Sequence, residues 1–157
     1  MANLFRMPEA ASLGTHAAVM LAREPDRPLS AHEMAARLQA SEAHLAKVMQ
    51  RLVKAGLVNS TRGPKGGFML DRAAGRISLL EVYEAIEGRV EPMACLFGLP
   101  SCGRKACIFG GYLAEFDAHF RDYLARATLS DLTADDAYNP PEADGAEAHA
   151  SLAGKTA

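Results

Sequence analysis

An amphipathic stretch, closely followed by a glycine-rich turn, limits the folds that this chain can adopt. Between Ser41 and Gly56, apolar side chains recur at the three- and four-residue spacing of a helix; they are Leu45, Val48, Met49, Leu52 and Val53. Ser41 is a suitable N-cap, and Gly56 is a suitable left-handed C-cap. The spacing therefore predicts a helix with one buried face.

The opposite face of this predicted helix is basic or hydrogen-bonding. Just before it, Ser30 and Glu33 form an S-x-x-E pattern that predicts the capping box of a shorter helix, and a polar turn leads from there to Ser41. In a helix-turn-helix, a second helix of this kind lies in the DNA major groove. A solvated helix in a bundle is the alternative interpretation. The exposed face carries His44, Lys47, Gln50, Arg51 and Lys54.

A β-hairpin is predicted directly after this helix. Residues 57–62 and 68–70 have strand character, and the turn between them, 63–67, contains three glycines and a proline. The order helix, helix, hairpin is that of a winged helix-turn-helix. Arg62 and Lys65 stand at the hairpin tip, where neighbouring glycines let the backbone approach phosphates or let arginine enter a minor groove.

Charge is distributed unevenly along the chain. The net charge is only -2, but the stretch from Arg23 to Arg76 contains ten Lys and Arg against five Asp and Glu, a net of +5, whereas the remainder carries -7. A basic segment in an otherwise acidic chain favours a protein that lays one face on double-stranded DNA. Scattered surface charge is the alternative interpretation.

Helices are also predicted on both sides of this unit. One begins near Pro8 and runs to about Ala22, and another begins at a second capping box, Ser78 and Glu81, and ends at Gly88. A longer helix, 112–127, carries an apolar stripe that we expect to pair with a second copy of the chain, with core packing as the alternative. Its members are Leu113, Phe116, Phe120, Tyr123, Leu124 and Ala127.

We therefore expect a mainly α fold with a small β-hairpin wing. The predicted organisation is a winged helix-turn-helix DNA-binding domain (1–90), a cysteine loop (91–111), a C-terminal dimerisation helix (112–130) and a disordered tail (131–157). The sequence contains no uninterrupted apolar run of about 18 residues, and its start lacks the pattern of a signal peptide. We expect a cytoplasmic protein without a membrane partner.

All three cysteines lie in one short loop, at Cys95, Cys102 and Cys107. Three neighbouring thiolates are soft ligands suited to an iron–sulfur cluster or to zinc. Direct thiol redox sensing and inert packing are the alternatives, although the glycines, proline and basic residues around these cysteines are not typical of a core. No C-x-x-C pair or catalytic partner is present, so the sequence does not indicate a thiol oxidoreductase or another enzyme.

Together these residues resemble a known family. The segment from Leu52 to Leu70, with its S-x-R-G-x-x-G-G-F wing, the segment from Ile77 to Gly88 and the three-cysteine loop resemble the Rrf family of bacterial winged-helix regulators, of which IscR, NsrR, RsrR and CymR are members. The resemblance implies a homodimeric transcription factor, commonly a repressor, whose C-terminal helices pair. In many members an iron–sulfur cluster sets the affinity for DNA.

The resemblance also implies a ligand set. Cluster-binding members hold iron with three cysteines, usually separated by five and five residues, where this chain has six and four; the cluster type, 2Fe-2S or 4Fe-4S, stays open. Some members add a histidine three residues after the last cysteine, but position 110 is glycine. Others use a residue of the first helix of the partner subunit, which implies His16, with Ser12 and Glu9 as further candidates.

Two functional interpretations remain open. The first is an operator-binding regulator controlled by a cluster; the second is a cluster-free member of the family, regulated by a partner enzyme, a small ligand or direct thiol oxidation. In both, Gln50 and Arg51 are expected to read bases. The expected DNA contacts are Ser41, His44, Lys47, Gln50, Arg51, Lys54, Arg62 and Lys65.

Overall fold

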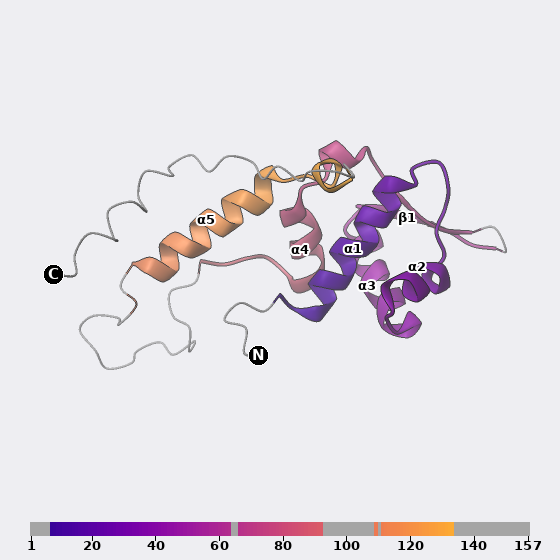
Figure 1. The fold of residues 1–157 in the computed structure, drawn as a ribbon, viewed down its shortest axis with the longest axis horizontal. Helices are drawn as coiled ribbons and strands as arrows, with labels where there is room; N and C mark the ends of the chain where they lie inside the picture. Colours follow the sequence, from indigo (N-terminus) through magenta and orange to yellow (C-terminus); the bar gives the residue numbers. More distant parts are fainter. Residues whose placement is uncertain (1–6, 64–65, 93–108, 110, 134–157) are drawn as a thin grey trace.

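The structure, a computed structural model, describes residues 7–63, 66–92, 109 and 111–133. It is mainly helical with a two-stranded antiparallel hairpin, as the sequence predicts (Figure 1). The elements run in the order α1 (Glu9–Arg23), α2 (Ala31–Leu38), α3 (Glu42–Lys54), β1 (Val58–Thr61), β2 (Gly67–Leu70), the 3-10 helix η1 (Ala74–Arg76), α4 (Leu79–Glu87), α5 (Tyr112–Arg126) and the 3-10 helix η2 (Ser130–Leu132).

The helix-turn-helix consists of α2 and α3. Gln39 ends α2 in the left-handed region, with a φ of 52°, and Ser41 caps α3 by accepting the backbone N–H of His44 at 3.4 Å. Gly56 follows α3 at a φ of +70°, as expected of a left-handed C-cap. The predicted buried stripe is confirmed for Leu45, Val48, Met49 and Leu52, and Val53 is partly buried.

The wing is anchored to the rest of the domain through its second strand. Val58 pairs with Leu70 and Thr61 with Gly67, and the backbone of Phe68 exchanges hydrogen bonds of 2.8 and 3.0 Å with Leu29. A Cβ atom at Gly67 would lie 2.7 Å from the carbonyl oxygen of Leu29. Glycine at this position therefore allows the wing to lie against the segment that leads into α2.

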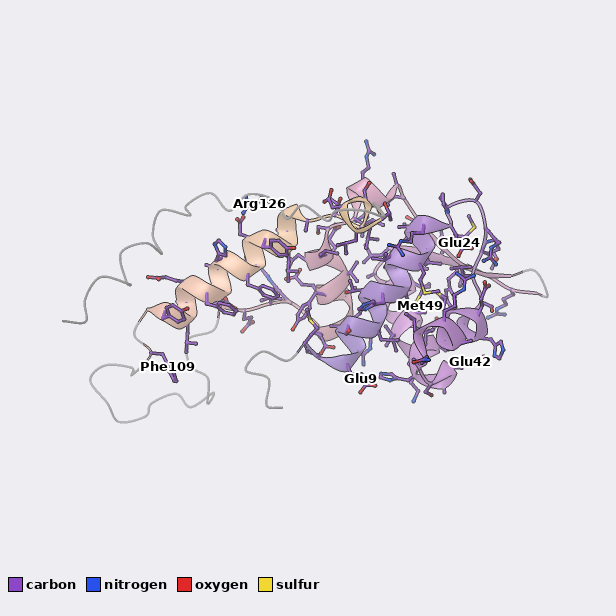
Figure 2. All side chains as sticks on the ribbon, in the orientation of Figure 1. Glu9, Glu24, Glu42, Met49, Phe109 and Arg126 are labelled. Atoms are coloured by element: carbon purple, nitrogen blue, oxygen red, sulfur yellow. The ribbon has the colours of Figure 1, made fainter. Side chains whose placement is uncertain are left out.

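The core lies where α1, α3 and α4 meet. Met49, labelled in Figure 2, is fully buried there. Gly14 of α1 permits the close crossing, because a Cβ atom at this position would lie 2.2 Å from Cδ1 of Ile86 and 2.9 Å from Cγ1 of Val48. Helix α3 therefore packs closely against α1 and the last turn of α4.

Of the two predicted capping boxes, only that of α4 is complete. Ser78 and Glu81 exchange side-chain-to-backbone hydrogen bonds of 2.9 and 3.2 Å. At α2, Ser30 accepts the N–H of Glu33 at 3.1 Å, but the expected return bond does not form. The reason is electrostatic, because the carboxylate of Glu33 binds two arginines instead, Arg27 and Arg37.

Helix α5 lies beside α4 and extends away from the other helices (Figure 1). After it, the chain returns to the core: Leu79 donates its N–H to the carbonyl of Ala127, and Leu129 donates to Ile77, both at 2.9 Å. Leu129 is fully buried. The boundary expected at residue 131 falls inside η2, while the predictions for most of the cysteine loop and for 134–157 lie outside the described residues.

No helix in the described part of the chain combines the length and the apolar character that a membrane span requires.

Candidate nucleic-acid interface

The outer face of α3 presents three exposed side chains, Lys47, Gln50 and Lys54. Their spacing of three and four residues places them on one side of the helix. Within the described residues, these side chains have no hydrogen-bond or ion-pair partner, so their charges and donors face solvent. This face matches the basic surface that the sequence predicts for a recognition helix.

His44 and Arg51, which lie on one flank of α3, contact neighbouring helices instead. His44 Nδ1 lies 3.8 Å from Oε1 of Glu9 in α1. Arg51 Nη1 donates to the carbonyl oxygen of Ile86 in α4 at 2.6 Å. Arg51 is exposed, as Lys47 and Lys54 are, but its Nη1 is engaged by α4, so fewer unengaged side chains face solvent than the sequence suggests. No sequence pattern marks this contact, because its acceptor is a backbone carbonyl.

The beginning of α3 is exposed and is also tied to α2. Ser41 is exposed, but its hydroxyl is engaged in capping the helix. Glu42, in the first turn, accepts a hydrogen bond from His32 Nδ1 of α2 at 2.9 Å. This contact links α2 and α3 on their exposed side.

The wing adds polar groups next to α3. Three residues of β1, Asn59, Ser60 and Thr61, are exposed, and Asn59 donates to the Asp71 carboxylate at 2.5 Å. Arg62 follows β1 and is exposed without a side-chain partner among the described residues. Lys65 lies outside the described residues.

Several cations of the basic stretch are neutralised within the protein. Arg27 and Arg37 both bind Glu24 and Glu33, in a cluster that joins the end of α1 to α2. The hydrogen bond from Arg37 is the main cause that lowers the pKa of Glu24, and that from Arg27 lowers the pKa of Glu33. The charges of Arg27 and Arg37 are therefore paired within the protein. The positive potential at the surface depends more on Lys47, Lys54 and Arg62 than a count of all Lys and Arg in this stretch implies.

The cysteines Cys95, Cys102 and Cys107 lie outside the described residues, and within the described ones no group of three or more His, Cys, Asp and Glu could hold a metal. His16 is described and exposed on α1. Its Nδ1 donates to the carbonyl of Ser12 at 2.7 Å, which leaves Nε2 as the ring nitrogen with the lone pair. Glu9, Ser12 and His16 line one groove of about 510 Å³ between α1 and the end of α2.

The apolar stripe of α5 is only partly covered. Tyr112 is 58% exposed and Phe116 is 45% exposed, although Phe116 stacks on Phe120 with ring centroids 6.0 Å apart. Figure 2 shows Phe109 at the end of α5 farthest from the core. A cavity of about 290 Å³ lies beside the contact between α4 and α5, and its lining residues include Leu80, Tyr83, Val90, Phe116, Phe120 and Arg121.

Comparison with known proteins identifies the family. Residues 7–135 match the model of the Rrf2 family, described as iron-dependent transcriptional regulators. The chain is 38% identical over 82 residues to BadM of Rhodopseudomonas palustris, which covers 52% of this chain and 53% of BadM. It is 32% identical over 106 residues to the HTH-type transcriptional regulator IscR of Xenorhabdus nematophila, which covers 67% of this chain and 64% of IscR. The chain thus spans less than two thirds of the length of either relative.

The fold is also that of a solved structure. The structure of CymR, the global cysteine regulator of B. subtilis, superposes with a TM-score of 0.69 over 83% of this chain and 97% of CymR, at 24% sequence identity. That likeness concerns the fold. Because the family model spans most of the sequence and the winged helix-turn-helix is in place, the chain belongs to the Rrf2 family of DNA-binding transcriptional regulators, which are not enzymes.

Proposed function

We propose that this chain acts in the cytoplasm as a homodimeric regulator that binds operator DNA and whose DNA affinity is set by an iron–sulfur cluster. The observation that carries the DNA-binding part is the outer face of α3, where Lys47, Gln50 and Lys54 point to solvent while other cations of the basic stretch are paired. A helix with this face, followed by a wing, fits the major groove and the adjacent backbone.

Each expected DNA contact has a role in this proposal. Lys47, Lys54 and Arg62 neutralise phosphates, and Lys65 extends this contact at the wing. Gln50 reads a base edge, because a carboxamide pairs with adenine through two hydrogen bonds. Ser41 and His44 stand at the N-terminal end of α3, where the backbone N–H groups and the helix dipole favour a phosphate. Arg51 contributes indirectly, through its hydrogen bond to α4, as argued below.

The exposed part of the apolar stripe of α5 supports the proposed dimer. Burying the rings of Phe116 and Phe120 against a second copy removes apolar surface from water at about 25 cal/mol per Å². A two-fold protein then presents two α3 helices to two half-sites, whose spacing is fixed near one helical turn, about 34 Å. Any change in the angle between subunits therefore changes the affinity for the operator.

The donor set fits a cluster. Cys95, Cys102 and Cys107 supply three thiolates within thirteen residues, and thiolate sulfur is the usual ligand of iron in such groups. The fourth donor is His16, whose ring is oriented by its bond to Ser12 and keeps Nε2 available. When bound, the cluster supplies redox or ligand-exchange chemistry. Glu9 and Ser12 line the same groove and are the next candidates.

The test is anaerobic purification of the full chain, followed by visible absorption and by iron and sulfide analysis. We expect a coloured protein, and we expect Cys95→Ser, Cys102→Ser and Cys107→Ser each to bleach it. His16→Ala should retain a cluster with shifted absorption or faster loss, whereas the matched control His32→Ala should not. Wild-type protein without iron that still binds DNA would contradict the cluster and favour a member regulated by a partner enzyme, a small ligand or thiol oxidation.

A further inference from the structure

The last turn of α4 is the point where the recognition helix is attached to the rest of the molecule. The side chain of Ile86 packs beside Val48 of α3, at the crossing that Gly14 permits. Its carbonyl oxygen accepts the hydrogen bond from Arg51 Nη1 at 2.6 Å. Carbonyls in the last turn of a helix lack partners within the helix, and a cation there also complements the helix dipole. Arg51 therefore satisfies an acceptor that α4 itself leaves open.

A second set of contacts continues from this turn toward α5. Gly88 ends α4 with a φ of +93°, which glycine adopts without strain. Val90 then donates its N–H to Oε1 of Glu84 at 3.1 Å, and its carbonyl accepts Arg121 Nη1 of α5 at 3.5 Å. Residues 88–92 are thus attached to both α4 and α5, and α4 is attached to α3.

We propose that Arg51 is a positioning residue that does not read bases, and that it is the first link of a polar relay from the recognition helix to α5. The links are Arg51 to Ile86, Glu84 to Val90, and Val90 to Arg121. Reading guanine by a bidentate contact requires two N–H groups of the guanidinium on the base edge, and here Nη1 is engaged by a backbone carbonyl of α4. The part that concerns DNA rests on the proposed function.

The relay joins two places where a signal can enter. Val90 and Arg121 line the cavity of about 290 Å³ between α4 and α5, so any group that fills this cavity touches the far end of the relay. Residues 88–92 also lead directly into the segment that holds the cysteines. A displacement at either place changes the support of Ile86 and, through Arg51, the seating of α3. Closely packed interfaces favour discrete shifts of this kind.

The attachment can be measured without DNA, by hydrogen exchange of the full chain. The substitution Glu84→Ala removes the acceptor for the N–H of Val90. We therefore expect faster exchange of the backbone amide hydrogens in residues 88–92 and in the last two turns of α3. The matched control is Glu87→Ala, an exposed residue of the same helix whose side chain has no hydrogen-bond partner among the described residues. Unchanged exchange in α3 of the Glu84→Ala variant, or an equal change in the control, would overturn the relay.

The role in DNA binding is tested by the salt dependence of affinity. Arg51→Lys keeps the charge and loses the guanidinium, and Arg51→Gln loses both. If Arg51 positions α3, both variants weaken binding to a similar extent, with the base preference and the slope of log affinity against log salt unchanged. The control Lys47→Gln should lower that slope by about one. Far-UV circular dichroism confirms that each variant is folded.

The outcomes separate the two proposals. If Arg51→Gln lowers the slope and Arg51→Lys restores it, Arg51 contacts a phosphate; if Arg51→Gln changes the preferred sequence, Arg51 reads a base. Either result rejects the positioning role and leaves the proposed function standing. If the wild type binds no DNA, the proposed function fails together with the DNA-related part of this inference, while hydrogen exchange still decides whether the relay exists.

Discussion

Lys47 and Arg51 lie one turn apart on α3 and carry the same charge, but their neighbours give them different roles. Nothing in the described structure binds the Lys47 ammonium, which faces solvent, whereas the Arg51 guanidinium is held by the carbonyl of Ile86. Sequence alone treats both as DNA contacts because it shows the helix face and not what packs against its flank.

The first residue-scale prediction concerns the outer face of α3. Lys54→Gln should weaken binding to all DNA sequences and lower the salt slope by about one, because one phosphate contact and its released counterions are lost. Gln50→Ala should instead cost about 1–3 kcal/mol at the preferred site and relax the sequence preference. Arg37→Gln is the control, since its charge is paired with Glu24 and Glu33. If Arg37→Gln and Lys54→Gln lower the salt slope equally, DNA affinity depends only on the net charge of the protein, which would contradict a specific phosphate contact by Lys54.

The second residue-scale prediction concerns pH. The pKa of Glu24 and that of Glu33 are lowered by hydrogen bonds from Arg37 and Arg27, respectively, relative to the ordinary 4.5. A carboxyl group with a lowered folded-state pKa adds stability above its unfolded pKa, and this stability is lost as the pH falls through the folded-state pKa. Urea unfolding should therefore show stability falling below pH 4.5. The variant Glu24→Gln, Glu33→Gln should show a weaker fall; an identical profile would rule out the cluster as its cause.

At the scale of elements, the crossing of α1 over α3 and α4 depends on Gly14. Gly14→Ala should destabilise the protein by about 1–3 kcal/mol through overpacking, against a gain of at most about 1 kcal/mol in helix propensity. Adding Ile86→Val should recover part of the loss, because it removes the nearest atom, Cδ1. Gly75→Ala is the control, since its Cβ would meet only Ser130 at 3.7 Å. Chemical denaturation measures all of these; a neutral Gly14→Ala would contradict the close crossing.

Local patterns predict most of the elements. The spacing of Leu45, Val48, Met49 and Leu52 predicts α3 and its buried face, and the Ser78–Glu81 pair predicts the start of α4. Each pattern lies within the element that it predicts, or a few residues from it, so local sequence is sufficient to predict these two helices.

Contacts between distant segments are not predictable in this way. The Glu33 carboxylate leaves its capping position for Arg27 and Arg37 only because the end of α1 lies beside α2. The return of residues 127–129 to residues 77–79 uses backbone groups, which carry no sequence signal. The contact between Arg51 and Ile86 belongs to the same class. The sequence therefore predicts which residues of α3 belong to the candidate site but not their separate roles. In the structure, Lys47, Gln50 and Lys54 face solvent, whereas Arg51 contacts α4.

At the scale of the whole molecule, α5 and the wing lie at opposite ends (Figure 1). We predict that Phe116→Glu dissociates the dimer in sedimentation experiments, because a charge would enter the apolar stripe. Ala118→Glu is the control, since a residue two positions away on a helix faces a different direction. Ala118 is exposed. An undisturbed dimer in the Phe116→Glu variant would place the interface elsewhere.

In the proposed function, the state of the three-cysteine loop sets the affinity of the winged helix for DNA. The most direct measurement is the binding of anaerobically prepared wild type and of Cys102→Ser to one duplex, selected with the wild type, over a range of salt concentrations. We expect the affinity of both proteins to fall steeply with salt, because both present Lys47, Lys54 and Arg62, and we expect the two affinities to differ at every salt concentration. Equal affinities, or binding that does not depend on salt, would contradict the proposed function.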